Sequence, residues 1–586
     1  MVEWLLAQAT PAIPDPPAAG IGAIVALVLF IVVSVWLGTV AQRVVERSQF
    51  IQGYFQGNRG LGAWTIALTA TVQSGGTFMG FPSLVYTYGW GVALWICSYM
   101  VVPMTGFGLI AKRVAQISRR TGAVTMPDLF RARFGSPTAG LISSLLIIVF
   151  MSIMMIAQFK AGALVMKIAW PGSGTLALSE DGPTATPVPV EQASAASSET
   201  PPRNWQSWLA REKIYLIGLA VFSLTVVGYT LIGGFLAAVW TDLLQSVMMF
   251  LGVMLLFVLA MMAFGGFERA SRQAIANVEQ AALDQGKTPE QARQAASAFV
   301  SGNGQKPNGM PWLPVTMAFS FFCFWPFAGT ASPAGVVRVM ACKDTSVLRK
   351  SIFLLAIYNM GIYLPLIAIC IAARAMMPDL GSKSDEVIPR MALTLTQSLP
   401  LGSWLSGLIL AAPFGAIMAT VSSYLLVIAS GLVRDVYQRF VNPQVTDHEI
   451  RRLTYFVMAG IGIVAVGLNI DPVQHLQTLV VFSSGCAASA FLIPTVMMCY
   501  WRGATAAGTI AAMLAGASSA FGLNMIGLLI AYRTQTSFAA YALLGFDPIV
   551  WGLAMSLVTG IVVSLCTRPP EAALVSKLFD REEKAV

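Results

Sequence analysis

The chain has 586 residues, of which 56% are apolar and only 11% are charged, and its mean hydropathy is +0.71. Soluble domains are about half apolar and about a quarter charged, so a water-soluble core could not bury this much apolar surface. The composition therefore excludes an ordinary soluble protein. The net charge of +9 comes from lysines and arginines in short loops rather than from one basic stripe, so it does not indicate a nucleic-acid partner.

Residues that usually carry metal or covalent chemistry are few and dispersed. The seven cysteines fall in or beside apolar segments, which fits neither a disulfide framework nor a zinc site. The two histidines, His448 and His475, are far apart in the sequence. No nucleophile–base pair or phosphate-binding loop occurs in a plausible setting, so nothing indicates an enzyme.

Thirteen apolar segments are long enough to cross a hydrocarbon core of about 30 Å, which takes about 20 helical residues. The first follows an N-terminus without the basic start of a signal peptide, so we expect it to be retained as a membrane helix. The predicted spans are 20–40, 61–83, 91–111, 138–169, 213–232, 241–264, 313–337, 351–374, 402–432, 453–470, 476–499, 505–530 and 548–567.

The basic residues predict the orientation of these spans. Clusters of lysine and arginine follow the first, third, seventh, ninth, eleventh and last spans, and all of them lie on one side if the N-terminus is outside. The positive-inside rule then predicts a multi-pass protein of the cell (inner) membrane with an extracytoplasmic N-terminus and a cytoplasmic C-terminus. This orientation predicts two long outer loops, a disordered or extended one at 171–210 and one at 267–310 with a polar helical pattern over 272–298.

Two predicted spans contain residues that interrupt helices. The span at 61–83 has polar residues and paired glycines between 69 and 77, and the span at 313–337 contains Pro326, Gly329 and Pro333. Lipid does not tolerate backbone groups without hydrogen-bond partners, so such breaks are expected to line a cavity or to coordinate a cation. A packing face of small residues is the structural alternative.

The positions of the two interruptions correspond. Each begins a set of five spans, and consecutive sets of five cross the membrane in opposite directions. Interrupted helices at matching positions of inverted repeats predict a transporter site near the bilayer midplane.

Several stretches resemble the solute:sodium symporter family. Residues 57–62, GNRGLG, are similar to the family's GxRxLG lead-in, and residues 229–245, YTLIGGFLAAVWTDLLQ, are close to its YxxxGGxxAVxWTDxxQ stretch. Within this family, the chain looks most like the pantothenate and proline transporters, and residues 70–91 look most like the pantothenate transporters. Further similar stretches are 338–350 and 413–437, within a resemblance that covers roughly residues 20–530.

The resemblance implies an all-α polytopic membrane protein with a five-plus-five inverted-repeat core, the LeuT-like fold. The first repeat is expected at 61–264 and the second at 313–499, with an extra N-terminal helix at 20–40 and two C-terminal helices at 505–567. It also implies sodium-coupled import of a small organic solute by alternating access. An organic acid such as a monocarboxylate or a pantothenate-like compound, or an amino acid, is the expected solute, with Na⁺ and the lipid bilayer as the other partners.

The resemblance further implies a sodium site between the second and ninth spans. Carried over residue by residue, the carbonyl ligands fall on Ala70, Gln73 and Ala416, and the hydroxyl positions fall on Ala419 and Thr420. The family usually has serine where this chain has Ala419. Because sodium prefers several oxygen ligands, this departure weakens the expected site.

Asp242, at the start of the sixth span, corresponds to an aspartate that the family uses on the sodium release path. A favourable anion near a helix N-terminus is the structural alternative for this residue. Lys160 is a charge within an apolar span, where it could attract an anionic solute or could extend towards the headgroups.

Substrate contacts are expected from the two interruptions and the spans that face them. Some relatives have a tyrosine gate where this chain has Ala328, so Phe324 or Trp325 is expected to shield the solute. The expected substrate residues are Ser74, Gly76, Thr77, Phe324, Trp325, Ala328, Asn359 and Lys160.

Two other functions remain open from the sequence. A transporter of the same fold could use protons or exchange instead of sodium, and Ala419 motivates this alternative. A membrane solute sensor is the other, because some relatives carry a fused signalling domain. Only about 20 residues follow the last predicted span, which favours a transporter.

Overall fold

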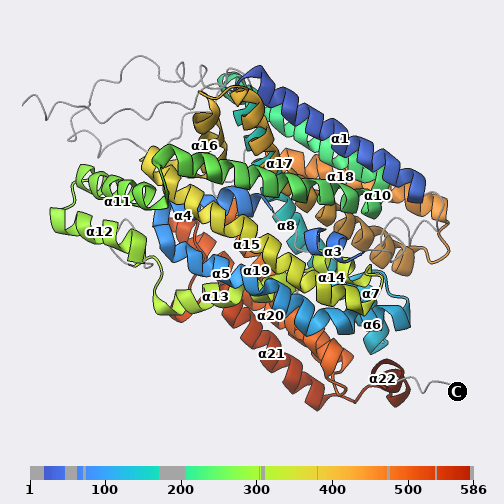
Figure 1. Cartoon of the computed structure of the whole chain (residues 1–586). Helices are drawn as coiled ribbons and strands as arrows, with labels where there is room; N and C mark the ends of the chain where they lie inside the picture. Colours follow the sequence, from blue (N-terminus) through green and yellow to red (C-terminus); the bar gives the residue numbers. More distant parts are fainter. Residues whose placement is uncertain are drawn as a thin grey trace, which may run out of the picture.

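The computed structural model describes residues 19–45, 62–69, 74–170, 205–301, 304, 311–330, 332–378, 380–470, 476–534 and 538–580, and these are almost entirely helical (Figure 1). In chain order the elements are α1 (Ile21–Val45), α3 (Ala63–Thr69), η2 (Gly76–Gly80), α4 (Phe81–Tyr88), η3 (Gly89–Val92), α5 (Ala93–Val102), η4 (Pro103–Ala111), α6 (Lys112–Thr121), α7 (Met126–Phe134), α8 (Pro137–Ala169), α10 (Trp205–Phe264), α11 (Phe267–Asp284), α12 (Pro289–Ser301), α13 (Val315–Thr330), α14 (Pro333–Met340), α15 (Thr345–Met376), η6 (Gly381–Glu386), α16 (Val387–Thr396), α17 (Gly402–Ser430), η7 (Gly431–Val441), α18 (Asp447–Leu468), α19 (Leu476–Tyr500), α20 (Ala506–Thr534), η8 (Leu543–Gly545), α21 (Pro548–Cys566) and α22 (Ala572–Phe579).

Among the described residues, ten helical stretches are long and apolar enough to cross a membrane, or eleven when α13 and α14 are counted as one bent span. Two of the ten, Gly76–Thr121 and Glu212–Phe264, contain 46 and 53 residues, which is about twice the length that one crossing needs. Each of them contains a glycine with positive φ, Gly89 at 73° and Gly234 at 59°. If each of these two stretches is divided at its glycine, the eleven spans become thirteen, which is the number that the sequence predicts.

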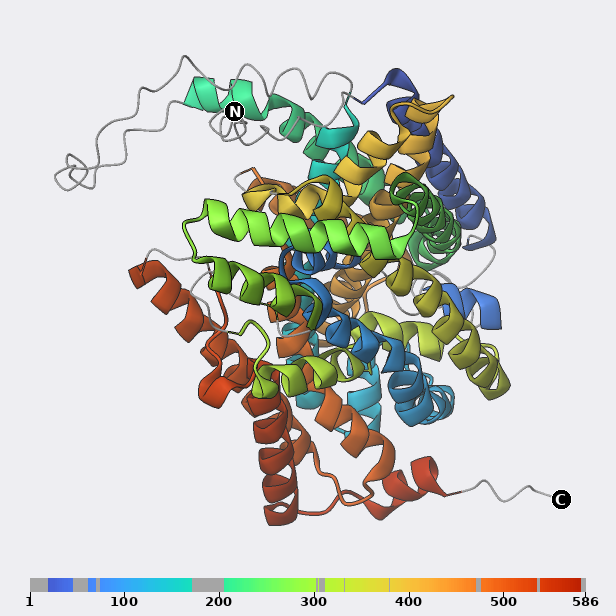
Figure 2. The same ribbon diagram turned by 60° about the vertical axis from the view of Figure 1, so that its left-hand side comes forward.

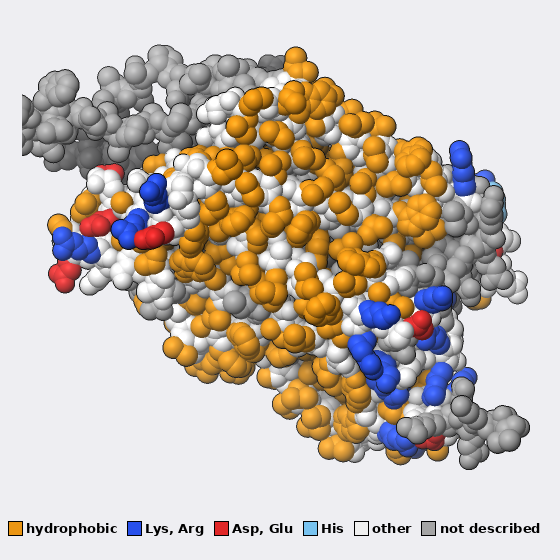
Figure 3. All heavy atoms as spheres, in the orientation of Figure 1, with side chains coloured by type: hydrophobic (Ala, Val, Ile, Leu, Met, Phe, Trp, Pro, Cys, Tyr) orange, Lys and Arg blue, Asp and Glu red, His pale blue; other side chains and the backbone are white. Residues whose placement is uncertain are grey.

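The surface of the bundle fits a membrane protein. Large apolar side chains cover its middle, whereas charged side chains gather over α11 and α12 at one end and near α6 and α22 at the other (Figure 3). Three large apolar side chains are strongly exposed: Leu224 at 79%, Phe353 at 68% and Ile463 at 72%. Exposure of such side chains is unfavourable in water but favourable in lipid. The described part of the chain is therefore a multi-pass membrane bundle, with α1 lying along α10 (Figure 1).

The second of the two predicted loops, 267–310, contains two helices where the sequence predicted one polar helical pattern. Gly286, with φ of +79°, and Pro289 separate α11 from α12, because neither residue favours a continuing helix at that point. The Asn277 side chain donates hydrogen bonds to the carbonyl oxygens of Arg374 and Ala375 at 3.0 and 2.9 Å. The hairpin is therefore attached to α15 and lies at the end of the bundle away from α22 (Figure 1 and Figure 2).

The helix after the first of the two predicted loops begins earlier than predicted. Helix α10 starts at Trp205, so the disordered or extended structure predicted for 171–210 is wrong for its last six residues. Residues 171–204 lie outside the described part of the chain. Trp205, Trp208 and Leu209 stand at i, i+3 and i+4, and this helical spacing was the available signal in an otherwise polar sequence.

Candidate functional site

The first predicted interruption lies between α3 and η2. Helix α3 ends at Thr69, Ser74 is not helical, and η2 begins at Gly76; residues 70–73 lie outside the described part of the chain. Side chains satisfy the backbone N–H groups where the helix resumes. Gly75 N donates to Gln158 Oε1 at 2.7 Å, and Gly76 N donates to Ser74 Oγ at 3.1 Å. A break in the apolar interior is stable here because neighbouring polar groups replace the missing helical bonds.

The second predicted interruption lies between α13 and α14. The two helices are bent by 43° relative to each other. Ser332 has extended backbone angles (φ −60°, ψ 118°), and Pro333 is the first residue of α14, a position where its missing N–H costs nothing. The carbonyl oxygen of Pro326 accepts hydrogen bonds from the hydroxyls of Thr330 at 2.5 Å and Thr105 at 3.3 Å. The bend therefore also has side-chain partners that stabilise it.

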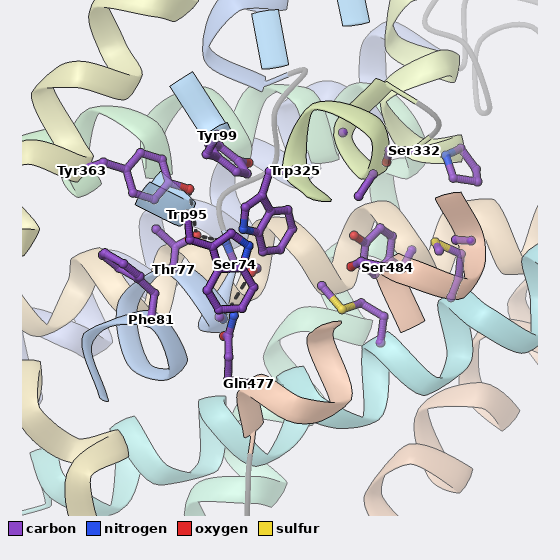
Figure 4. A pocket seen from close by; sticks show the side chains of 18 residues that line it. Ser74, Thr77, Phe81, Trp95, Tyr99, Trp325, Ser332, Tyr363, Gln477 and Ser484 are labelled. Carbon is purple, nitrogen blue, oxygen red and sulfur yellow. Dashed lines mark hydrogen bonds between the residues drawn. The ribbon is translucent and has the colours of Figure 1, made fainter. Parts of the chain in front are cut away.

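A cavity of about 90 Å³ lies between the two interruptions (Figure 4). Its lining comes from both interrupted helices and from α5, α8, α15, α17 and α19. No Asp, Glu, Lys, Arg or His is among these described lining residues. They are Ser74, Gly76, Thr77, Phe81, Trp95, Tyr99, Met151, Met154, Trp325, Ala328, Gly329, Ser332, Pro333, Tyr363, Tyr424, Gln477, Ser484 and Ala487.

Aromatic side chains form one wall of this cavity. Trp325 stacks on Trp95 with ring centroids 5.8 Å apart and meets Tyr99 edge to face at 5.4 Å. Tyr99 lies 4.8 Å from the ring of Tyr363, whose hydroxyl is 3.3 Å from the Thr77 hydroxyl (Figure 4). Such a wall can pack an apolar solute body, while the hydroxyls and the unwound backbone can hydrogen-bond its polar groups.

Five of the predicted substrate residues line the cavity and three do not. Ser74, Gly76, Thr77, Trp325 and Ala328 lie in the lining.

The other three predicted substrate residues have different surroundings. Phe324 is buried behind the wall, with its ring 5.0 Å from that of Trp325. Asn359 is buried within α15 and is not part of the lining. Lys160 has its Nζ atom 4.0 Å from Oδ2 of Asp385 in η6 and also lies outside the lining. In this arrangement Phe324 supports Trp325 rather than shielding the cavity itself.

The predicted sodium ligands are only partly within the described residues. Ala70 and Gln73 lie outside them. Ala416, Ala419 and Thr420 are buried on α17, where the Thr420 hydroxyl donates to the carbonyl oxygen of Ala416 at 3.0 Å.

Helix α17 passes beside the start of η2. A methyl group added to Gly75 would lie 3.3 Å from Cγ1 of Ile417 and 2.8 Å from Cβ of Ala161. The chain on the η2 side of the first interruption therefore approaches both α17 and α8 closely. This places the α17 segment with the predicted hydroxyl ligands next to the interruption.

Asp242 forms a buried ion pair with Arg338 of α14. Arg338 also donates to the hydroxyl of Ser423 at 2.6 Å, and Ser423 donates to the carbonyl oxygen of Ala419 at 2.7 Å. Asp242 follows the non-helical Gly234 by about two turns, beyond the first turn where a helix dipole favours an anion. The structure therefore favours an ion-pair role over the helix-terminus alternative.

Several cavity and support residues were not predicted. Gln158 and Gln477 are polar amides within predicted apolar spans, and this was the available signal, because polar side chains are costly in lipid. A methyl group on Gly80 would lie 2.2 Å from Oε1 of Gln477, so α19 contacts η2 closely. Nothing in the sequence marks Trp95, Tyr99 or Tyr363 as cavity residues, because aromatic residues are common in membrane helices.

Known proteins are similar in sequence to most of this chain. The profile of the sodium:solute symporter family matches residues 54–178 and 213–516, which is more than half of the chain. The sodium/pantothenate symporter of Escherichia coli (strain K12) is 26% identical over 563 residues, covering 94% of this chain and 98% of that protein. The sodium/pantothenate symporter of Haemophilus influenzae is 27% identical over 491 residues, covering 82% of this chain and 86% of that protein.

A solved structure has the same fold. It is a substrate-bound outward-open state of a Na⁺-coupled sialic acid symporter, which covers 94% of this chain and 99% of its own chain with a TM-score of 0.64 and 18% identity. At that identity the likeness shows the fold alone. The fold and the extent of the family match lead to one conclusion: the chain belongs to the sodium:solute symporter family.

Proposed function

We propose that this protein is a secondary active symporter that uses a sodium gradient to import a small organic solute by alternating access. One observation carries the proposal: a cavity of about 90 Å³ lies where two interrupted helices face each other. Unwound backbone at this place supplies hydrogen-bonding groups that an intact helix would use internally. The relatives that are sodium/pantothenate symporters support the same function.

The lining of the cavity indicates the class of solute. Apart from tyrosine, none of the described lining residues is ionisable. The described lining therefore offers no charged side chain to pair with a charged solute. Hydroxyls and backbone groups near Ser74 and Thr77, together with a bound sodium ion, would compensate a carboxylate. The aromatic wall of Trp95, Tyr99 and Trp325 would hold its apolar part. A small organic acid or an amino acid fits these properties.

The proposed sodium site joins the first interruption to α17. Its ligands would be the carbonyl oxygens of Ala70, Gln73 and Ala416 and the hydroxyl of Thr420, with Ala419 at the position that usually supplies a second hydroxyl. The hard oxygen ligands of this set suit Na⁺.

Asp242 would lie on the release path of the ion. In the described arrangement Arg338 neutralises this carboxylate. Movement of α14 away from α10 would free the carboxylate to attract the departing sodium ion. The ion would then leave past the same helix that opens the cavity.

The proposed orientation puts α6, α7 and α22 in the cytoplasm and α11 and α12 outside, in the cell (inner) membrane. The gathering of basic side chains near α6 and α22 supports this assignment (Figure 3). We further propose that 61–264 and 313–499 form the two inverted repeats. The ion pair of Lys160 with Asp385 and the contact of Ser83 with Ser384, at 2.7 Å, would then close the outer side of the cavity.

Uptake into proteoliposomes tests the proposed function. Labelled organic acids, amino acids and sugars are offered under an inward sodium gradient, an inward proton gradient, or no gradient. We expect accumulation of at least one organic acid or amino acid with the sodium gradient only. Accumulation driven equally by protons, or uptake that no gradient changes, would contradict sodium coupling and favour the alternative that Ala419 motivates.

A further inference from the structure

The C-terminal helix α22 is held at the basic end of the bundle by an aromatic side chain among arginines. The ring of Phe579 lies 5.1 Å from the guanidinium carbon of Arg113, 5.0 Å from that of Arg133 and 5.6 Å from that of Arg502. Each guanidinium over an aromatic face is attracted by the ring's negative charge density. One side chain of α22 therefore interacts with three separate parts of the bundle.

A fourth arginine binds the end of the same helix. Arg120 donates hydrogen bonds to the carbonyl oxygens of Lys577, Leu578 and Asp580 at 3.2, 3.0 and 3.0 Å. These are carbonyl groups at a helix C-terminus, which lack partners within the helix and carry partial negative charge. Leu578 is buried, so the end of α22 is also anchored by apolar contact.

An ion pair completes the attachment. Oδ1 of Asp580 lies 2.8 Å from Nη2 of Arg502, and its other oxygen accepts a hydrogen bond from Ser576 at 2.8 Å. The hydrogen bonds from Ser576 and Arg502 lower the pKa of Asp580, so its carboxylate is ionised at neutral pH. The contacts of α22 are thus specific in geometry and in charge.

The arginines belong to elements that pack with different parts of the bundle. Arg113 and Arg120 are on α6, which packs against α14, the helix that follows the second interruption. Arg133 is on α7, which leads into α8, and α8 packs against α17 and α19. Arg502 is in the turn between α19 and α20. Helix α22 therefore bridges the part of the bundle that contains α14 and the part that contains α17.

We propose that α22 is a latch that restrains opening of the cavity towards the cytoplasm. The proposal rests on the proposed function, in which α14 moves away from α10 and, with it, Arg338 moves away from the Ser423 hydroxyl of α17. Contacts that exist in the closed arrangement and are broken on opening favour the closed state. We take this opening as the step that limits turnover, so loss of the latch should speed both the opening and net transport.

The variants that test the latch alter α22 and leave the arginines in place, because Arg133 is buried and donates to the carbonyl oxygens of Trp501 and Arg502 at 3.1 and 3.3 Å. Phe579→Ala removes the ring, Phe579→Tyr keeps an aromatic face as the matched control, and deletion of 571–586 removes the helix. In sodium-driven uptake by proteoliposomes, Phe579→Ala and the deletion should raise the maximal rate by about threefold or more, while Phe579→Tyr should match the unaltered protein. A rate equal to or below that of the unaltered protein for both altered chains would overturn the latch.

Hydrogen–deuterium exchange in lipid nanodiscs gives a second readout that needs no solute. Phe579→Ala should increase amide exchange in α6, α7 and α14 and leave α11 and α12, at the far end of the bundle, unchanged. Unchanged exchange in α6, α7 and α14 would overturn the proposal. If the unaltered protein showed no sodium-driven uptake of any solute, the proposed function would fail, and the exchange experiment would still decide whether α22 restrains these helices.

Discussion

Arg338 forms a buried ion pair with Asp242, and this pair joins α14 to α10 beneath the cavity. The hydroxyl of Ser423 extends the network to the carbonyl oxygen of Ala419 on α17. Three helices that approach the proposed ion site are thus connected by one arginine side chain. The proposed movement of α14 away from α10 would break this connection.

The mutual attraction of Asp242 and Arg338 should add little net stability, because both charges are buried. Loss of one partner should be costly, because it leaves the other charge buried and unpaired. Arg338→Gln leaves the Asp242 carboxylate buried without a cation and should lower the free energy of unfolding by about 3–5 kcal/mol. The double variant Asp242→Asn with Arg338→Gln removes both charges and should recover most of that loss. Thermal unfolding in detergent measures both effects, and a double variant as unstable as Arg338→Gln would refute this account.

The hydroxyl of Thr420 is proposed to be a sodium ligand. Thr420→Ala should raise the sodium concentration for half-maximal uptake by about tenfold, because a ligand to a charged ion is lost. Ala419→Ser supplies the hydroxyl that relatives usually have and should lower that concentration. Thr454→Ala, which removes a hydroxyl bonded within α18, is the matched control. Sodium dependence that Thr420→Ala leaves unchanged would show that Thr420 does not bind the ion.

The close approach of η2 to α19 gives a prediction about Gly80. A methyl group there would lie 2.2 Å from Oε1 and 2.8 Å from Cβ of Gln477, so Gly80→Ala should displace α19 and reduce uptake severely. Gln477→Ala in the same chain removes the far end of the glutamine side chain and should restore part of the uptake if the glutamine does not itself bind solute. Gly460→Ala is the control, because an added methyl group there would lie more than 4 Å from every atom outside its own stretch of helix. Normal uptake by Gly80→Ala would contradict the described packing.

Lys160 pairs with Asp385 rather than lining the cavity. Lys160→Gln and Asp385→Asn should therefore alter the uptake rate alike and leave the solute concentration for half-maximal uptake within about twofold, as expected for a weak, partly exposed pair. If Lys160 instead bound an anionic solute, Lys160→Gln alone would raise that concentration. Uptake kinetics of the two single variants distinguish these roles.

The sequence predicted the membrane spans and the two interruptions for the same physical reason. Lipid offers no hydrogen bonds, so long apolar runs must be helices, and glycines or prolines within them must be compensated elsewhere. It could not predict the compensating groups, because Gln158 lies on a different helix and about 80 residues from Gly75, whose N–H it accepts. That pairing depends on how α8 packs.

The direction of side chains also limited the prediction of the site. Phe324 and Trp325 are neighbours in sequence, but successive residues of a helix point about 100° apart, so only Trp325 reaches the cavity. Asn359 and Lys160 lie on helices that border the site, yet their side chains have other surroundings. The residue types indicated the two interrupted helices, α8 and α15 as lining the cavity, but not α5 or α19, and packing decided which faces line it.

Protection of the cavity by its solute tests the central claim most directly. In a chain without native cysteines, Ala328→Cys places a thiol in the lining, and Ser297→Cys places one on an exposed face of α12, outside the membrane-spanning helices, as a control. With the solute found by the uptake screen, sodium and solute together should slow thiol labelling at position 328 more than sodium alone or solute alone. Position 297 should label at the same rate under all of these conditions. Equal labelling at position 328 with and without solute would contradict a solute site between the two interrupted helices.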